Sequence, residues 1–338
     1  MRRSLARLSI PLRTPFVTAG GVVGARELLL LRLEDDEGAV GFGEAAPLEP
    51  YDGVSLDQVA VALRTGDLSQ PHARAAEEMA RLDLEARREG RPLGEPGADA
   101  IAVNRTLAAG PPDEVAGSAR EALREGYACF KLKVGLPDDV ERVAAVRDAI
   151  GPWPALRLDA NGAWSAGEAI ERIASLEPYD LQLVEQPCAT LEELAEVRPR
   201  VRAPIAADES VRSPEDVRTA AAARACHVVN VKLAGSGGYS AAREALREAE
   251  ARGLRPFLSS TLDGPWGIAA ALQLAASEGV ALACGLATLE LFDAQVARAL
   301  PGPRGGLLPV PQGPGLGVEV HDDALREVLV EELHAADA

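Results

Sequence analysis

Short apolar runs alternate with longer amphipathic stretches from residue 100 onward. The amphipathic stretches predict helices, because several open with a hydroxyl residue three positions before an acidic one, as Ser165 and Glu168 do. The apolar runs, which we predict to be strands, are residues 101–103, 129–134, 155–158, 181–184, 204–207, 228–231, 256–259 and 281–284. Strands and helices that alternate so evenly predict an α/β fold, a (β/α)₇β barrel of the TIM type. The alternative is an open doubly wound sheet, but no glycine-rich GxGxxG motif follows the first strand.

Residues 1–95 show a different pattern. Antiparallel strands are predicted at residues 8–15, 27–34 and 39–44, and helices at residues 56–65 and 72–88. This predicts an α+β domain before the barrel. Beyond the barrel, residues 301–314 are rich in Pro and Gly and predict a loop, and residues 324–333 predict a closing helix.

Composition and charge narrow the class of protein. The chain has 338 residues, 47% of them apolar, so it can bury a large core. No stretch is long and apolar enough for a membrane span, and the basic N-terminus lacks the apolar core of a signal peptide, so we expect a cytoplasmic protein. The net charge of −17 argues against a nucleic-acid partner. Four cysteines without metal-ligand spacing argue against a disulfide framework or a zinc site.

Lysine is rare in this chain. Of the 35 basic residues only three are lysines, Lys131, Lys133 and Lys232. A lysine amine can lose its proton in a suitable environment, whereas an arginine guanidinium in effect cannot. Lys131 and Lys133 are separated by one residue in a predicted strand, so both side chains face the same side. We expect the two ammonium groups to lower each other's pKa, so that one can act as a general base.

Five consecutive predicted strands, the second to the sixth, end in charged residues. These residues are Lys133, Asp159, Glu185, Asp208 and Lys232, at spacings of 26, 26, 23 and 24 residues. In a parallel barrel the carboxyl ends of the strands meet at one end, here called the mouth, where functional side chains lie. The sequence therefore predicts that two lysines and three acids converge on one mouth.

Three carboxylates directed at one point repel each other unless a cation lies between them. An oxygen-only ligand set favours Mg²⁺, with Mn²⁺ or Ca²⁺ as alternatives, over zinc. The alternative is that each acid is a solvated residue near a helix N-terminus, which suits one Asp but not three in successive units. Lysines on both flanks of a metal predict proton abstraction next to a substrate carboxylate, with stabilisation of the resulting enediolate.

Several stretches carry a family resemblance: LDANGAWS (158–165), VEQPCATLEELAEVR (184–198), PIAADESVR (204–212), SSTLDGPWGIAAALQLA (259–275) and ACGLATLELFDAQV (283–296). With these stretches, KxK on the second strand and Lys on the sixth, nearly the whole chain resembles the enolase superfamily and, within it, the muconate-lactonizing group. The resemblance implies a capping domain in residues 1–95, a (β/α)₇β barrel in residues 96–305, and a C-terminal segment, 306–338, that packs back on the cap. Within the group, the stretches look most like the o-succinylbenzoate synthases, the dehydratases of menaquinone biosynthesis.

The resemblance also implies roles for the residues at the mouth. Lys133 would remove the proton α to the substrate carboxylate and, as an ammonium, help hydroxide to leave. Lys232 would stabilise the enediolate, partly by a cation–π contact with the ring, and Lys131 would tune Lys133. The implied metal ligands are Asp159, Glu185 and Asp208, oriented by Asn161 and Glu209.

Substrate selection is implied to come from the cap, where residues 18–24 and residues 50–55, around Tyr51, form loops able to close over the mouth. The hydroxyl groups of Ser259, Ser260 and Thr261 are expected to bind a second carboxylate of the substrate. Gly285 and Leu286, after the eighth strand, leave that wall uncharged. The expected partner is thus a small-molecule carboxylate; a monomer and a homo-oligomer are both compatible with the sequence.

Other activities of the same group stay open. A dipeptide epimerase needs an acid near the eighth strand to bind an ammonium group, and the nearest here is Glu290. An N-acylamino acid racemase has no ammonium group to bind and is harder to exclude. A mandelate-racemase-like enzyme would need a His at the seventh strand, where Ser259 stands. A non-catalytic barrel would lack some of the lysines or acids, and none is missing.

Overall fold

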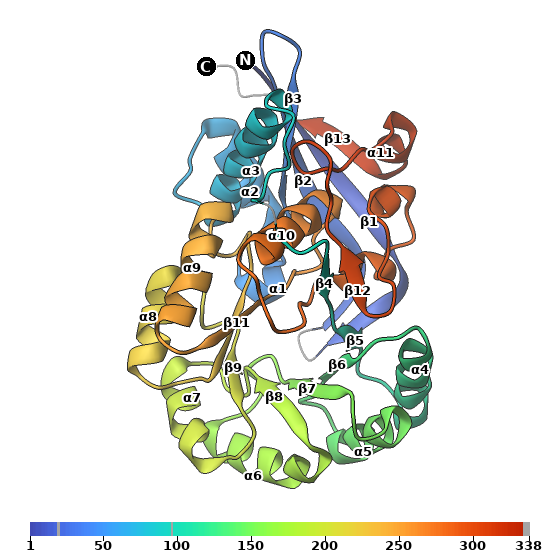
Figure 1. Cartoon of the computed structure of the whole chain (residues 1–338), viewed down its shortest axis with the longest axis vertical. Helices are drawn as coiled ribbons and strands as arrows, with labels where there is room; N and C mark the ends of the chain where they lie inside the picture. The colour runs from blue at the N-terminus through green and yellow to red at the C-terminus, as the bar shows by residue number, and fades with distance from the viewer. Residues whose placement is uncertain (19–20, 96, 334–338) are drawn as a thin grey trace.

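An antiparallel sheet and a curved parallel sheet form the two parts of the computed structural model, which describes residues 1–18, 21–95 and 97–333 (Figure 1). The first sheet has the strand order β13-β1-β2-β3, with β1 (Arg2–Thr18), β2 (Gly21–Glu34) and β3 (Val40–Ala45). The three strands predicted there are confirmed, two of them as parts of longer strands. The loop predicted at residues 18–24 is wrong in most of its length, because β1 and β2 continue into it as a hairpin; residues 19 and 20 lie outside the described residues.

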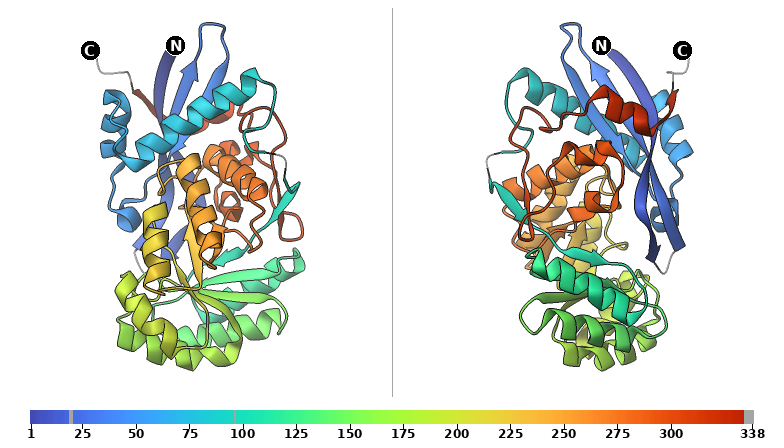
Figure 2. Two further views of the ribbon diagram at one scale, coloured as in Figure 1. Left: turned by 60° about the vertical axis from the view of Figure 1, so that its left-hand side comes forward. Right: turned by 90° about the vertical axis from the view of Figure 1, so that its right-hand side faces the viewer.

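The leucine run of β2 explains why this sheet is buried on both faces. Alternate residues of a strand point to opposite faces. Leu29 and Leu31 pack with residues of α2 (Leu56–Thr65) and α3 (Pro71–Arg88), whereas Leu28 and Leu30 belong to the large core that continues into the barrel. The sheet therefore lies between its own helices and the barrel, and its hairpin extends toward the parallel sheet (Figure 2).

Seven parallel strands in strict sequence order form the second sheet. The strands are β5 (Arg105–Leu107), β6 (Cys129–Lys133), β7 (Ala155–Asp159), β8 (Leu181–Glu185), β9 (Ile205–Ala207), β10 (Val228–Val231) and β11 (Arg255–Leu258). The helices between them are α4 (Pro112–Arg124), α5 (Asp139–Ile150), α6 (Ala166–Leu176), α7 (Leu191–Val197), α8 (Pro214–Ala222) and α9 (Tyr239–Ala251), and α10 (Pro265–Ser277) follows β11. The predicted barrel is confirmed, with these helices around the outside of the sheet (Figure 1).

The closure of the barrel differs from the prediction. Of the predicted eighth strand, residues 281–284, only Cys284 forms a bridge, with Val103, and the next residue, Gly285, bridges Ser259. The predicted first strand is also displaced. β4 (Ala100–Ala102) pairs antiparallel with β12 (Leu307–Pro309), and β5 takes its place beside β6.

The C-terminal segment returns to the first sheet. After α11 (Asp322–Val328), β13 (Leu329–Leu333) pairs antiparallel with β1, with Leu333 opposite Leu5. The closing helix predicted at residues 324–333 is therefore wrong in its second half, because the free edge of β1 offers backbone partners that outweigh local helix propensity. The boundaries at residues 95 and 305 stay a prediction.

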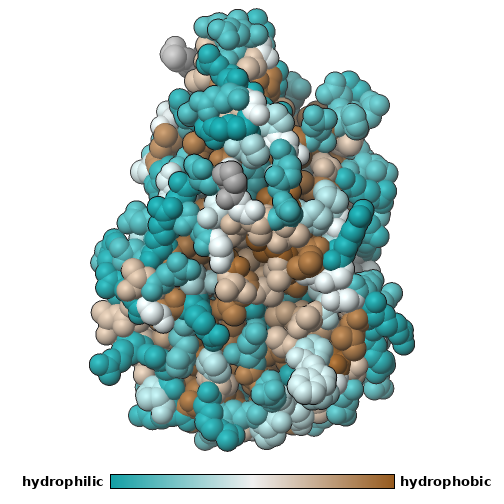
Figure 3. All heavy atoms as spheres, in the orientation of Figure 1, coloured by the Kyte–Doolittle hydropathy of each residue, from teal (hydrophilic) through white to brown (hydrophobic). Residues whose placement is uncertain are grey.

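The surface is mostly hydrophilic over the cap and the outer helices, and apolar side chains gather near the centre of the face in Figure 3. In the part of the chain that the structure describes, no helix is long and apolar enough to cross a membrane.

Candidate active site

The charged side chains predicted for the mouth come from adjacent strands. Lys133, Asp159 and Glu185 are the last residues of β6, β7 and β8, and they are paired side by side across the sheet. Asp208 and Lys232 directly follow β9 and β10. The structure therefore brings all five residues to the same end of the barrel.

Lysines and acids contact each other directly at this end. Lys131 Nζ lies 2.8 Å from Asp159 Oδ2 and 2.9 Å from Glu185 Oε1, and Lys133 Nζ lies 2.6 Å from Asp159 Oδ2. On the opposite side, the ammonium group of Lys232 contacts Asp208. Each acid is thus paired with a lysine, and the charges of the two groups offset each other in a buried environment.

These contacts overturn one expectation about Lys131. Burial lowers the pKa of its ammonium group, but the carboxylates of Asp159 and Glu185 outweigh burial and raise the pKa above its ordinary value. Burial would raise the pKa of Asp159, but Lys131 and Lys133 hold it well below its usual range. The expected mutual lowering of the lysine pKa values is therefore wrong for Lys131, because the acids lie closer to it than the sequence showed.

Asn161 and Glu209 continue the network from Lys133. Lys133 Nζ donates to Asn161 Oδ1 at 2.9 Å, and Asn161 Nδ2 donates to Glu209 Oε1 at 2.9 Å. Asn161 adopts a left-handed backbone conformation, with φ of 46°, that directs its amide between the two partners. Asn161 also contacts Asp159, whose Oδ1 accepts from its backbone N–H, whereas Glu209 reaches the site through Asn161. The roles assigned to both residues stay a prediction.

Asn230 was missed by the sequence analysis. Its Nδ2 donates to Glu185 Oε1 at 2.8 Å, and its Oδ1 accepts from the hydroxyl of Ser259 at 2.7 Å. Its place two residues before Lys232, on the same side of an otherwise apolar strand, was the available signal. Gln186 was missed too, and its Oε1 accepts from the backbone N–H of Asp208 at 2.7 Å.

The acids offer oxygen ligands of the kind that a hard divalent cation prefers. Asp159, Glu185 and Asp208 are all buried, and Glu185 Oε2 has no hydrogen-bond partner among the described residues. As the side chains stand, no three His, Cys, Asp or Glu residues of the described chain converge closely enough to form a metal site, since each acid is turned toward a lysine. The donor set nevertheless fits Mg²⁺, because the three buried carboxylates stand at the ends of adjacent strands and one oxygen of Glu185 has no hydrogen-bond partner among the described residues.

A cavity of about 570 Å³ lies over these residues. Its barrel side is formed by the three lysines and by Asp159, Asp208 and Glu209, and its opposite side by neutral side chains of the cap and of later loops. The neutral residues include Phe16, Val22, Val23, Leu262, Thr288 and Leu291. A substrate bound here would meet charge on one side and apolar or hydroxyl groups on the other.

All of the predicted substrate-binding residues except Leu286 line the cavity. Ser260 and Gly285 line the cavity, and the hydroxyl of Ser260 lies 2.8 Å from that of Thr288, which sequence reasoning missed. Leu286 is fully buried and does not line the cavity, so its assignment is wrong; the chain turns into the 3₁₀ helix there and directs this side chain into the core. Ser259 and Thr261 border the cavity, but their hydroxyls are engaged by Asn230 and Asp263.

Tyr51 reaches the mouth from the cap. It lies in α1 (Glu49–Asp52), a single helical turn where a loop was predicted. Its hydroxyl donates to Asp208 Oδ1 at 2.9 Å and accepts from Lys232 Nζ at 2.7 Å. Burial and the charge of Asp208 raise the pKa of Tyr51 well above its ordinary value, so the phenol stays protonated and donates.

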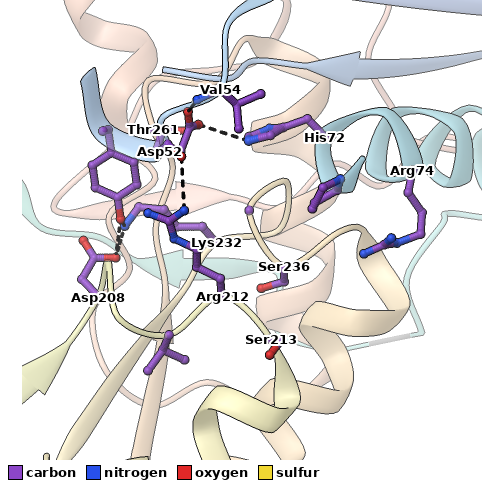
Figure 4. Close-up of a pocket in the computed structure, with 14 residues that line it drawn as sticks. Asp52, Val54, His72, Arg74, Asp208, Arg212, Ser213, Lys232, Ser236 and Thr261 are labelled. Atoms are coloured by element: carbon purple, nitrogen blue, oxygen red, sulfur yellow. Dashed lines mark hydrogen bonds and ion pairs between the residues drawn. The ribbon is translucent and has the colours of Figure 1, made fainter. Parts of the chain in front are cut away.

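Tyr51, Asp208 and Lys232 also line a second cavity of about 280 Å³ between the cap and the barrel. Figure 4 shows Asp208 and Lys232 on one side of this cavity and Arg74 on the other. Tyr51 therefore forms part of the partition between the two cavities.

Comparison with known proteins places this arrangement in a family. Residues 114–324 match the family model described as enolase C-terminal domain-like. This chain belongs to the enolase superfamily. It is 39% identical over 332 residues to the o-succinylbenzoate synthase of Thermobifida fusca, covering 96% of this chain and 90% of that protein.

Two solved structures of the superfamily show the same fold. The muconate lactonizing enzyme from Pseudomonas fluorescens in complex with muconolactone is 25% identical, with a TM-score of 0.88 and coverage of 97% of this chain and 98% of that one. The dipeptide epimerase from Enterococcus faecalis in complex with Mg and the dipeptide L-Leu-L-Tyr is 27% identical, with a TM-score of 0.87 and coverage of 95% and 99%. Enzymes of the enolase superfamily depend on a divalent metal, in agreement with the donor set at the mouth.

Proposed function

We propose that this chain is an o-succinylbenzoate synthase, a carbon–oxygen lyase that dehydrates 2-succinyl-6-hydroxy-2,4-cyclohexadiene-1-carboxylate to 2-succinylbenzoate in menaquinone biosynthesis. The observation that carries the proposal is the 39% identity with the Thermobifida fusca synthase over nearly the whole of both chains. The paired lysines on opposite sides of the cavity agree with it, since this reaction begins with loss of a proton next to a carboxylate.

In this proposal Asp159, Glu185 and Asp208 hold Mg²⁺, which when bound stabilises negative charge on the carboxylate of the substrate. Lys133, as a neutral amine, takes the proton α to that carboxylate. The resulting ammonium group returns the proton to the hydroxyl group on the neighbouring carbon, and water leaves from the same face. One C–H and one C–O bond are broken, and the new double bond completes the aromatic ring.

The other residues of the mouth assist these two transfers. Asn161 accepts a hydrogen bond from Lys133 Nζ and so holds the amine toward the cavity. Lys232, on the opposite side, offsets the charge that develops on the enediolate, and Tyr51 holds its ammonium group through the hydroxyl. Lys131, paired with Asp159 and Glu185, stays protonated and fixes the positions of both acids.

The uncharged side of the cavity suits the rest of the substrate. The ring would lie against apolar side chains such as Phe16 and Leu291, and the hydroxyls of Ser260 and Thr288 would bind the carboxylate of the succinyl chain. Both hydroxyls can turn to donate, because they presently hydrogen-bond only to each other in the described structure.

The second candidate is racemisation of N-acylamino acids by the same two lysines. A dipeptide epimerase is disfavoured, because the acids lining the cavity in the described residues, Asp159, Asp208 and Glu209, all lie on the lysine side. Glu290, the nearest acid after the eighth-strand position, accepts hydrogen bonds from Arg105 and Tyr127, both at 2.7 Å. An N-acyl substrate has no ammonium group and needs no such acid.

The test is to mix the purified protein with Mg²⁺ and the cyclohexadiene precursor and to follow the loss of diene absorbance with and without a chelator. Rapid aromatisation that the chelator abolishes is the expected result. An inactive protein would contradict the proposal. Exchange of the α-proton of N-acylamino acids in deuterated water would then favour the second candidate, with dipeptides measured alongside.

A further inference from the structure

A buried glutamate of the cap contacts the first turn of the last barrel helix. The two carboxylate oxygens of Glu44, in β3, accept hydrogen bonds from the backbone N–H groups of Gly264 at 2.6 Å and Gly267 at 3.2 Å. The N-cap of α10 is Gly264, which has no side chain to cap the helix. Glu44 therefore caps α10 from the other domain, because its side-chain oxygens accept from backbone N–H groups in the first turn of the helix.

The two glycines make this contact possible. A Cβ atom at Gly264 would lie 2.7 Å from Glu44 Oε2, and one at Gly267 would lie 3.0 Å from Glu44 Oε1. Any other residue at either position would push the carboxylate away from the helix. The sequence of α10 is thus adapted to receive a side chain from the cap.

A buried arginine of the cap contacts the same part of the barrel. The guanidinium of Arg26, in β2, donates to the backbone carbonyls of Thr261 at 3.1 Å and Pro47 at 2.7 Å, and also to that of Ala46. Thr261 belongs to the barrel loop after β11, and Pro47 precedes α1, which carries Tyr51. One side chain therefore joins a loop of the barrel to the cap segment that enters the mouth.

Glu44 and Arg26, here called the cap–barrel latch, touch the segments that form the neutral side of the cavity. Ser260, Thr261 and Leu262 line the cavity and lie in the loop between β11 and α10. The latch holds this loop at two points, at Thr261 in its middle and at Gly264 where it joins α10. Leu262 needs such support, because its φ of 61° is unfavourable for a leucine.

We propose that Glu44 and Arg26 are positioning residues that set the shape of the substrate cavity by holding the loop of residues 259–264 against the cap. They touch none of the lysines or acids at the mouth, so they act on where the substrate binds and leave the proton transfers alone. The kinetic part of this proposal rests on the proposed dehydratase function.

The test compares Glu44→Gln and Arg26→Met with a matched control, Glu77→Gln. Glu77 is likewise buried in the cap and accepts two arginine hydrogen bonds, from Arg3 at 2.5 Å and Arg81 at 2.9 Å, but it does not line either cavity. We expect the two latch variants to raise KM about tenfold with kcat within about twofold of the wild type. The control should change neither constant.

A second measurement is independent of activity. Hydrogen exchange of at least one of the amides of Gly264 and Gly267 should accelerate in Glu44→Gln, because glutamine keeps only one acceptor oxygen for the two protons, and both amides should stay unchanged in Glu77→Gln. If the wild type has no dehydratase activity, the proposed function fails while this measurement still tests the latch.

Three outcomes would overturn the inference. The exchange of the two amides could be the same in Glu44→Gln as in the wild type. KM could rise equally in Glu44→Gln and Glu77→Gln, which would indicate a general loss of stability. Finally, kcat could fall with KM unchanged. If Arg26→Met does not fold, Arg26→Lys, which keeps the charge but cannot reach all the carbonyls, should give an intermediate KM.

Discussion

The two sides of the active-site cavity are built in different ways. The barrel side carries the charge, and its lysines and acids stand at the ends of regular parallel strands or directly after them. The cap side is neutral and is formed by a hairpin, a single helical turn and the loop after β11. Rigid strands fix groups that must transfer protons at defined distances, whereas loops can vary in shape to select a substrate.

This comparison predicts that changes on the barrel side reduce kcat and changes on the cap side raise KM. Removal of the metal should affect the barrel side, because its acids would hold the ion, and should leave the cap side unchanged.

The largest effect is expected for Lys133→Ala and Lys232→Ala. Each removes an amine that no other lysine can replace, so kcat should fall by at least about 10²- to 10⁴-fold. Circular dichroism should show an unchanged fold. A Lys133→Ala protein with a near wild-type rate would show that another group is the base.

Next in size is the effect of Asp208→Asn on metal binding. The amide lacks the negative charge of one proposed ligand, so the affinity for Mg²⁺ should fall by at least about tenfold, as measured by calorimetric titration. Asp263→Asn is the control, since Asp263 is a buried acid outside the mouth. An unchanged titration for Asp208→Asn would refute its assignment as a ligand.

A smaller effect is expected for Tyr51→Phe, because Tyr51 is a cap residue that touches charged groups of the barrel side. Loss of its hydrogen bonds to Asp208 and Lys232 should raise KM about 3- to 10-fold while kcat changes less. Steady-state kinetics of the two proteins would measure the split. A loss confined to kcat would place Tyr51 with the chemistry of the barrel side.

The smallest effect concerns the dependence of stability on pH at Glu44. Burial raises the pKa of Glu44 from its ordinary value of 4.5 to about 8. Between these values the folded protein holds a proton that the unfolded chain has released, so this group makes the free energy of unfolding fall as pH rises, by at most about 1.4 kcal/mol per pH unit.

Urea unfolding of the wild type and of Glu44→Gln at pH 5.5 and pH 7.5 would measure this contribution. The glutamine does not titrate, so the variant should lose less stability than the wild type over the same interval. Equal losses would show that Glu44 ionises at its ordinary pKa.

The sequence predicted the barrel because its signal is repeated and local. Each strand is a short apolar run, and several helices open with a capping residue, as α6 does with Ser165, α7 with Thr190 and α8 with Ser213. Prediction failed where a distant segment decided the outcome. Residues 329–333 form a strand because β1 lies beside them, and the predicted eighth strand depends on bridges from Cys284 and Gly285 to Val103 and Ser259, which lie far earlier in the chain.

Within the candidate site, the prediction succeeded for residues at strand ends and failed for their partners. The positions of Lys133, Asp159 and Glu185 follow from their place in the repeat. The pairing of Lys131 with two acids, which raises its pKa, depends on distances across the barrel that no spacing along the chain encodes. Thr288 was missed for the same reason, as it meets Ser260 only when the barrel closes.

The sequence by itself determined the fold class and the set of charged groups at the mouth. The periodicity of apolar residues fixes which residues stand last in each strand, and the carboxyl ends of parallel strands lie at the same end of the barrel. Only the tertiary structure decided which acid meets which lysine, that Tyr51 reaches Asp208, and that Glu44 caps α10. These contacts join residues far apart in the chain, and their formation depends on how the cap and the barrel pack, which is a property of the whole core.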